Sequence, residues 1–98
     1  MEGSRLSSIS IEGIQKKLQE EGFKLTLQRQ ATVEILLEHL NELLTAEEIY
    51  MFVKQKYPDI GLATVYRTLE ILTDLGIISR NLFDDGIGRY HLKQTVNR

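Results

Sequence analysis

Apolar side chains recur along the first half of the chain every three or four residues, the spacing of one face of an α-helix. One such face starts behind a serine-rich segment and stops before Gly22, a residue suited to a helix C-terminus. A second helical face starts after Thr26, whose hydroxyl can cap the helix, and this helix is predicted to end near Asn41. The inward positions predicted for these two helices are Ile11, Ile14, Leu18, Leu27, Ala31, Ile35 and, towards the end, Leu36 and Leu40.

Two further helices are predicted in the middle of the chain. Thr45 and Glu48 have the spacing of a capping box, so a third helix should begin there and end before Pro58. A fourth should follow the short Pro58–Gly61 connection and stop at Gly76. The predicted inward positions are Ala46, Ile49, Tyr50 and Val53 in the third helix and Leu62, Val65, Leu69 and Leu72 in the fourth.

The pattern changes after Gly76 to two short β-prone runs, residues 77–83 and 87–92. Asp84, Asp85 and Gly86 separate them, which indicates a hairpin with the glycine in a left-handed conformation. Four helices followed by a hairpin are typical of a winged helix-turn-helix, in which the fourth helix contacts DNA and the hairpin is the wing. The predicted fold class is therefore mainly α with a small two-stranded wing.

Composition restricts where such a domain works. With 98 residues and 42% apolar side chains, the chain can close one small core, and we assign residues 1–92 to one winged-helix DNA-binding domain. It has no cysteine, hence no disulfide or thiolate zinc site, in keeping with a reducing compartment. No apolar run approaches the roughly 20 residues of a membrane span, and the first ten residues do not resemble a leader. We expect a cytoplasmic protein with no membrane partner.

The formal net charge is −2, which argues against a protein that coats nucleic acid without selectivity. The charges are unevenly distributed: residues 1–60 carry seven basic and ten acidic side chains, and residues 61–98 carry five basic and four acidic. This distribution permits a neutral-to-basic surface on the fourth helix and the hairpin.

The outward side of the predicted fourth helix carries chemistry suited to DNA. Ala63 and Thr64 are small enough for close approach to the major groove. Arg67 can donate two hydrogen bonds to a guanine, and the Tyr66 ring can lie against a thymine methyl group or a phosphate. The alternative is structural: Tyr66 would be a half-buried aromatic residue, and Arg67 would pair with Glu70.

The predicted wing offers Arg80, Asn81 and Arg89 to phosphates or to a minor groove. An ordinary solvated hairpin would have a similar composition, so the pattern alone leaves both interpretations open.

Three segments together resemble the ferric uptake regulator family: Thr26-Leu-Gln-Arg29, Thr45-Ala-Glu-Glu-Ile-Tyr50 and Gly61-Leu-Ala-Thr-Val-Tyr-Arg-Thr-Leu69. The resemblance extends from about residue 11 to residue 92 and includes the spacing between the segments. It implies a dimeric repressor that binds an AT-rich inverted repeat in double-stranded DNA when a divalent metal, commonly Fe²⁺, occupies its sensor sites.

The resemblance also implies roles for individual residues. A minor-groove contact falls on Lys24, DNA-backbone contacts fall on Thr26, Arg29, Tyr50 and Thr64, and the base-contacting pair falls on Tyr66 and Arg67. The sequence departs from the family at Leu27, where a proline is commoner, and we expect a small effect on stability only.

The metal side of the family pattern is incomplete. Many members place a histidine just before the Ser or Thr that starts the third helix, where this chain has Leu43-Leu44-Thr45. His91 stands where a Glu or Asp ligand is common, and an imidazole can replace it. His39 matches no family ligand and is expected to be a solvated residue near a helix end. We expect no metal to be bound by this stretch alone, with Fe²⁺ and structural Zn²⁺ bound by a longer parent protein.

Residues 93–98 are expected to begin a linker to a dimerisation and metal-sensing domain that this sequence does not include. The chain by itself should then be monomeric and the parent protein a homodimer.

The sequence also bears on other classes of function. An enzyme is disfavoured, because the sequence has no cysteine nucleophile, glycine-rich phosphate loop or spacing for acid–base catalysis. Two alternatives stay open: a winged helix that binds protein, and a zinc-, manganese- or peroxide-responsive member of the same family. Arg67 favours the iron type, since the peroxide branch tends to have Asn there.

Overall fold

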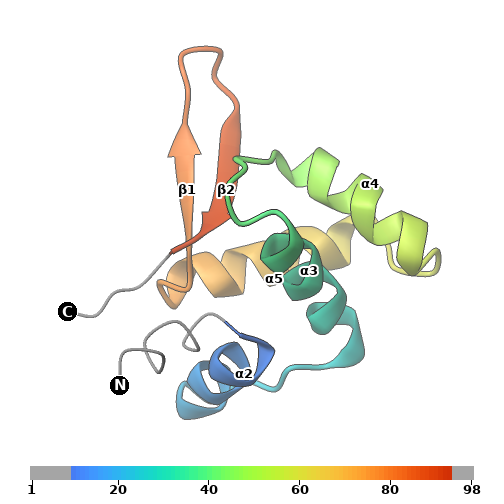
Figure 1. Ribbon diagram of the computed structural model, residues 1–98, viewed down its shortest axis with the longest axis vertical. Coiled ribbons are helices and arrows are strands. Elements are labelled where there is room, and N and C mark those ends of the chain that lie inside the picture. The colour runs from blue at the N-terminus through green and yellow to red at the C-terminus, as the bar shows by residue number, and fades with distance from the viewer. Residues whose placement is uncertain (1–9, 94–98) are drawn as a thin grey trace.

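The computed structural model describes residues 10–93, and the order of elements is the predicted one. Four helices precede an antiparallel hairpin (Figure 1): α2 Ile11–Glu20, α3 Leu27–Glu38, α4 Ala46–Lys56, α5 Leu62–Asp74, β1 Ile78–Leu82 and β2 Gly88–Leu92. The predicted fold class, mainly α with a small two-stranded wing, is confirmed. Among the described residues, no helix combines the length and apolar character needed to cross a membrane.

Helix α3 lies at the centre of the fold and contacts α2, α4, α5 and β2 (Figure 1). Because neighbours cover several of its sides, its buried residues are not confined to one stripe: Ala31, Thr32, Val33, Ile35 and Leu36 are all buried. The prediction that Leu27 faces inward is wrong, since 79% of this residue is exposed. Leu27 is the first residue of α3 and lies outside the contacts that bury the later turns.

Helix α5 buries one face against the core. Val65, Leu69 and Leu72 are buried as predicted, and Thr68 joins them. Its hydroxyl is satisfied because Oγ1 donates to the Thr64 carbonyl at 2.9 Å. Leu62 is wrongly predicted as a core residue, because it occupies the first position of the helix and is 37% exposed.

Side-chain caps fix where three of these helices begin, and at the start of α2 Ser10 Oγ accepts a hydrogen bond from the Gly13 amide at 3.1 Å. Thr26 Oγ1 accepts a hydrogen bond from the Arg29 amide at 3.2 Å, which confirms the predicted start of α3. Thr45 and Glu48 form both bonds of the predicted capping box, at 3.0 and 2.8 Å. Helix α3 ends at Glu38, earlier than predicted, and His39 forms its C-cap.

The hairpin pairs Ile78 with Leu92 at its base, and both side chains are buried. Its turn contains Gly86 at φ +79°, the left-handed conformation predicted from the sequence. The α3–α4 connection runs along β2, as Figure 1 shows, and Leu44 exchanges backbone hydrogen bonds of 3.1 and 2.7 Å with Tyr90. The wing is therefore joined to the helices by its backbone as well as by its core residues.

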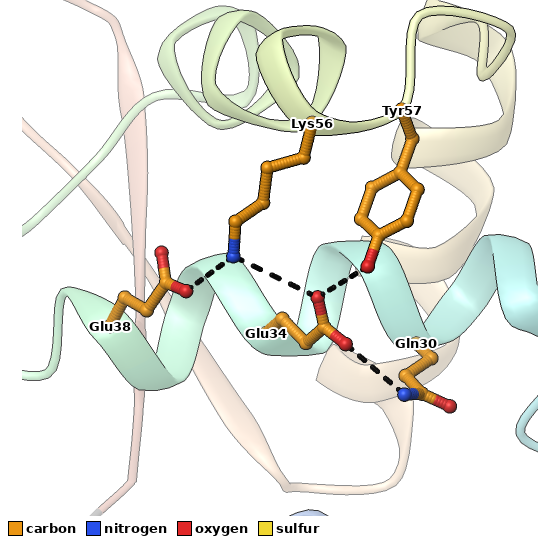
Figure 2. Close-up of polar contacts among 5 residues, drawn as sticks. All are labelled: Gln30, Glu34, Glu38, Lys56 and Tyr57. Carbon is orange, nitrogen blue, oxygen red and sulfur yellow. Dashed lines mark hydrogen bonds and ion pairs between the residues drawn. The ribbon is translucent and has the colours of Figure 1, made fainter.

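A polar network connects α3 to the C-terminal end of α4 (Figure 2). Lys56 Nζ donates to Glu38 at 2.6 Å, and Tyr57 Oη donates to Glu34 at 2.8 Å. These contacts raise the pKa of Lys56 and of Tyr57 above their ordinary values. Lys56 and Tyr57 are exposed, so the network contributes only modestly to stability.

Candidate nucleic-acid interface

Four of the predicted DNA contacts meet in one place, between the N-terminal turn of α3 and the first turns of α5. Thr26, Arg29, Thr64 and Arg67 line a shallow pocket of about 220 Å³. Hydroxyl groups and guanidinium groups from distant parts of the sequence thus converge there. Such donors are the groups that contact phosphates and base edges in protein–DNA complexes.

The exposed side of α5 agrees with the predicted one. Ala63, Tyr66, Arg67 and Glu70 are exposed, while Thr64 is half-buried. In the part of the chain that the structure describes, no ion pair joins Arg67 to Glu70. The structural alternative for Arg67 therefore finds no support, and Arg67 is one of the residues that line the pocket.

Tyr66 has a partner that the sequence did not indicate. Its hydroxyl donates to Glu47 Oε2 at 2.6 Å, although the two residues are nineteen positions apart and belong to α5 and α4. This hydrogen bond lowers the pKa of Glu47 and raises that of Tyr66. In the sequence, an acidic residue in the first turn of α4 is sufficiently explained by the helix dipole, so the contact with Tyr66 gave no separate signal.

Lys24 and Arg29 are structurally coupled. Arg29 Nη1 donates to the Lys24 carbonyl at 2.7 Å, and the guanidinium lies 5.9 Å from the centre of the Phe23 ring. Arg29 therefore holds the α2–α3 connection in place, while Lys24 on that connection is exposed. Arg29 thus fixes the backbone of the α2–α3 connection, and Lys24 adds an exposed cation to it.

Tyr50 is half-buried against the core, and Lys54 Nζ lies 5.8 Å from the centre of its ring. Helix α4 precedes α5 in the helix-turn-helix, the position from which such motifs contact the DNA backbone. The predicted backbone contact at Tyr50 is compatible with this placement.

The wing residues have different surroundings. Arg80 is exposed and its side chain lies across Gly88, where a Cβ atom would be 2.6 Å from Arg80 Nε. The Arg89 guanidinium is already engaged: it bonds Asp85 at 3.2 Å, lowering the pKa of that carboxyl group, and lies 4.8 Å from the Phe83 ring centre. Arg80 is thus the more accessible of the two cations.

Asn81 and His91 line a separate pocket, together with residues 40–43 of the α3–α4 connection. None of these residues lines the pocket that contains Arg67. The structure thus places Asn81 with the predicted metal-binding position instead of with the DNA contacts on α5.

His91, the candidate metal ligand, shares its pocket with polar residues as well as with Leu40 and Leu43. Across 10–93, no three His, Cys, Asp or Glu side chains are grouped closely enough to hold an ion. His91 Nδ1 is buried without a hydrogen-bond partner, but apolar Leu43 lies in the same pocket.

The expectation of a solvated His39 is wrong. Its side chain is only 19% exposed, its ring centre lies 4.4 Å from that of Phe52, and Nδ1 lies 3.1 Å from Glu42. The helix end places it between α4 and the loop, where it packs instead of facing water.

Taken together, α4 and α5 form a helix-turn-helix, and the hairpin that follows completes a winged-helix domain. Its exposed helix and the adjoining pocket have the composition of a DNA-contacting surface. The model of the ferric uptake regulator family matches residues 20–97, and the chain belongs to that family.

Individual relatives agree with this assignment. The chain is 51% identical over 84 residues to the ferric uptake regulation protein of Bacillus subtilis, covering 86% of this chain and 56% of that protein. Its structure resembles the ferric uptake regulator of Vibrio cholerae (TM-score 0.73, 35% identity, 82% of this chain and 61% of that one). It also resembles a zinc-bound manganese uptake regulator (TM-score 0.75, 32% identity, 84% and 61%). The chain thus spans little more than half the length of the relatives it matches.

Proposed function

We propose that this chain is the DNA-binding domain of a cytoplasmic, metal-responsive transcriptional repressor, and that it recognises an AT-rich inverted repeat through α5. The observation that carries this proposal is the convergence of Thr26, Arg29, Thr64 and Arg67 on one pocket beside the exposed face of α5. Small and guanidinium side chains in that arrangement suit a helix that enters the major groove.

The proposed roles follow from position. Arg67 and Tyr66 contact bases, and Ala63 permits close approach of the helix. Thr26, Arg29, Tyr50 and Thr64 contact the DNA backbone, Lys24 enters the neighbouring minor groove, and the wing adds contacts through Arg80 and Asn81. The N-terminal end of α3, where Thr26 is the cap, also attracts phosphate through its free amides and dipole.

Metal responsiveness is proposed for a longer homodimeric protein, with residues 93–98 beginning the linker to its second domain and His91 a candidate ligand. Residues 94–98 lie outside the described part of the chain. Fe²⁺ is the proposed signal, with structural Zn²⁺, because a ferric uptake regulation protein is 51% identical to this chain. The similarity to a manganese uptake regulator supports manganese as the alternative.

The proposal is tested by fluorescence anisotropy with two labelled duplexes, an AT-rich inverted repeat and a scrambled sequence of the same composition, across a salt series. We expect the repeat to be preferred and its affinity to fall steeply with salt, because phosphate contacts release counterions. Binding to neither duplex at low salt would contradict the proposal and direct attention to a protein partner.

A further inference from the structure

The hydrogen bond between Tyr66 and Glu47 constrains a side chain on the exposed face of α5. Tyr66 is 38% exposed, so part of its ring is accessible, yet its hydroxyl is held by a carboxylate on a different helix. At 2.6 Å the bond is short, as expected for a hydroxyl donating to a charged acceptor. The side chain is therefore fixed at both ends, at its Cα in α5 and at its Oη by α4.

Fixing both ends sets the direction in which the Tyr66 side chain extends from α5. The hydroxyl oxygen lies on the axis about which the ring turns, so the anchor restrains χ1, the torsion that sets where the ring stands, and leaves rotation about that axis. A side chain that is ordered before binding loses less entropy when the partner arrives. Arg67, the next residue along the chain, has no comparable anchor among the hydrogen bonds of the described residues.

The anchor also determines which part of Tyr66 can meet DNA. A phosphate at the hydroxyl would have to replace the Glu47 carboxylate and lie close to its negative charge, which is unfavourable. The exposed part of the ring has no such conflict and is apolar. The apolar group that the major groove offers is the C5-methyl group of thymine.

We propose that Glu47 is a positioning residue that holds the Tyr66 ring against a thymine methyl group, and so gives the domain part of its preference for AT-rich DNA. This inference rests on the proposed function and adds to it a residue on α4 that does not itself contact a base. It also assigns the contact made by Tyr66 to a methyl group and not to a phosphate.

The contact itself is tested without DNA, by following tyrosinate absorbance as the pH is raised. Tyr66→Phe identifies the transition that belongs to Tyr66, and we expect Glu47→Ala to move it down towards the ordinary pKa of tyrosine. Glu47 and Tyr90 are the groups that raise the pKa of Tyr66, and only the first is removed. An unchanged transition would overturn the inference.

The functional consequence is tested with the AT-rich repeat in which each thymine in turn is replaced by uracil, which lacks the methyl group. We expect one position per half-site at which this replacement weakens wild-type binding by about fourfold, the value of burying one methyl-sized group. The ratio of the dissociation constants for the uracil-containing and thymine-containing repeats should fall close to one in Glu47→Ala and in Tyr66→Phe. The double variant should give the same ratio as either single variant. Glu47→Gln, which keeps an oxygen acceptor, should restore most of it.

The controls separate position from charge. Glu70→Ala removes a carboxylate from the exposed face of α5 and leaves the hydrogen bond from Tyr66 to Glu47 in place, so it should leave the thymine-to-uracil ratio unchanged. Glu47→Ala could bind both repeats more tightly and keep the wild-type thymine-to-uracil ratio. The Glu47 carboxylate would then only repel phosphates, and the inference would be wrong. If Glu47→Ala does not fold, Tyr66→Phe, which removes one oxygen atom, provides the same comparison. Wild-type protein that ignores the repeat altogether would overturn the proposed function together with this inference.

Discussion

Arg67 illustrates how one exposed side chain can carry sequence preference. Its guanidinium lines the pocket beside α5, and within the described chain no carboxylate neutralises it. A planar group with several donors can bond two acceptors of one guanine at once, whereas an ammonium group has no such fixed geometry.

We therefore expect Arg67→Ala to reduce discrimination between the repeat and the scrambled duplex by roughly 1 to 3 kcal/mol, measured as the ratio of the two dissociation constants. Arg67→Lys is the matched control, because it keeps the charge and loses the planar fork. It should retain much of the overall affinity and still lose discrimination. Full discrimination in Arg67→Ala would remove this residue from the base-contacting pair.

Leu27 is a residue whose exposure suggests a stabilising substitution. It is the first residue of α3, it is 79% exposed, and Thr26 before it has an extended backbone at ψ 168°. Proline is favoured at the first helical position, and the residue before a proline prefers an extended conformation.

Leu27→Pro should accordingly stabilise the domain by about 0.4 to 1 kcal/mol, because proline restricts the unfolded chain. Thermal unfolding measures the change, with Leu27→Ala as the control that removes the leucine without restricting φ. A lower melting temperature for Leu27→Pro than for Leu27→Ala would show that the first turn of α3 does not tolerate a proline.

At the scale of elements, the positions where helices begin could be predicted from neighbouring residues. The contacts that each helix makes with other helices could not. Thr45 and Glu48 are three residues apart and cap α4 by contacts within one turn, so their spacing was sufficient to predict the bonds. The burial of Thr32 was not predicted, and Leu27 was wrongly predicted to face inward, because burial in α3 depends on which helices surround it. The hydrogen bond from Tyr66 to Glu47 was missed for the same reason, since it depends on how α4 and α5 cross.

The capping box makes a direct prediction for α4. Thr45→Ala should cost about 1 kcal/mol of unfolding free energy, because the Glu48 amide loses its acceptor at the helix start. Urea unfolding measures this loss. Thr45→Ser retains the hydroxyl and should recover most of the stability, and equal losses in the two variants would assign the effect to packing of the threonine methyl group.

At the scale of the whole molecule, a net charge of −2 is compatible with DNA binding only if cations are concentrated on one side. Arg29 lies in the first turn of α3 and lines one pocket with Thr64 and Arg67 of α5. Its side chain also bonds the carbonyl of Lys24 on the α2–α3 connection. Lys93 lies at the other end of α5, because its amide bonds the carbonyl of Ile77 just beyond that helix. The two ends of one helix should therefore differ in their contribution to binding.

This asymmetry is measurable from the salt dependence. Lys24→Ala should weaken binding to both duplexes alike and reduce the slope of log affinity against log salt concentration by about one unit, since one phosphate contact is lost. Lys93→Ala removes the same charge and should leave the slope unchanged. Equal slopes for the two variants would mean that the charge acts at long range and not through a contact.

The backbone bonds between Leu44 and Tyr90 give the domain a mechanical property. Leu44 immediately precedes Thr45, the cap of α4, and Tyr90 lies two residues before the end of β2. A twist applied to the chain where it leaves β2 would reach the start of α4 through the two backbone hydrogen bonds between Leu44 and Tyr90. A change in the orientation of the wing would therefore be transmitted directly to the helix-turn-helix.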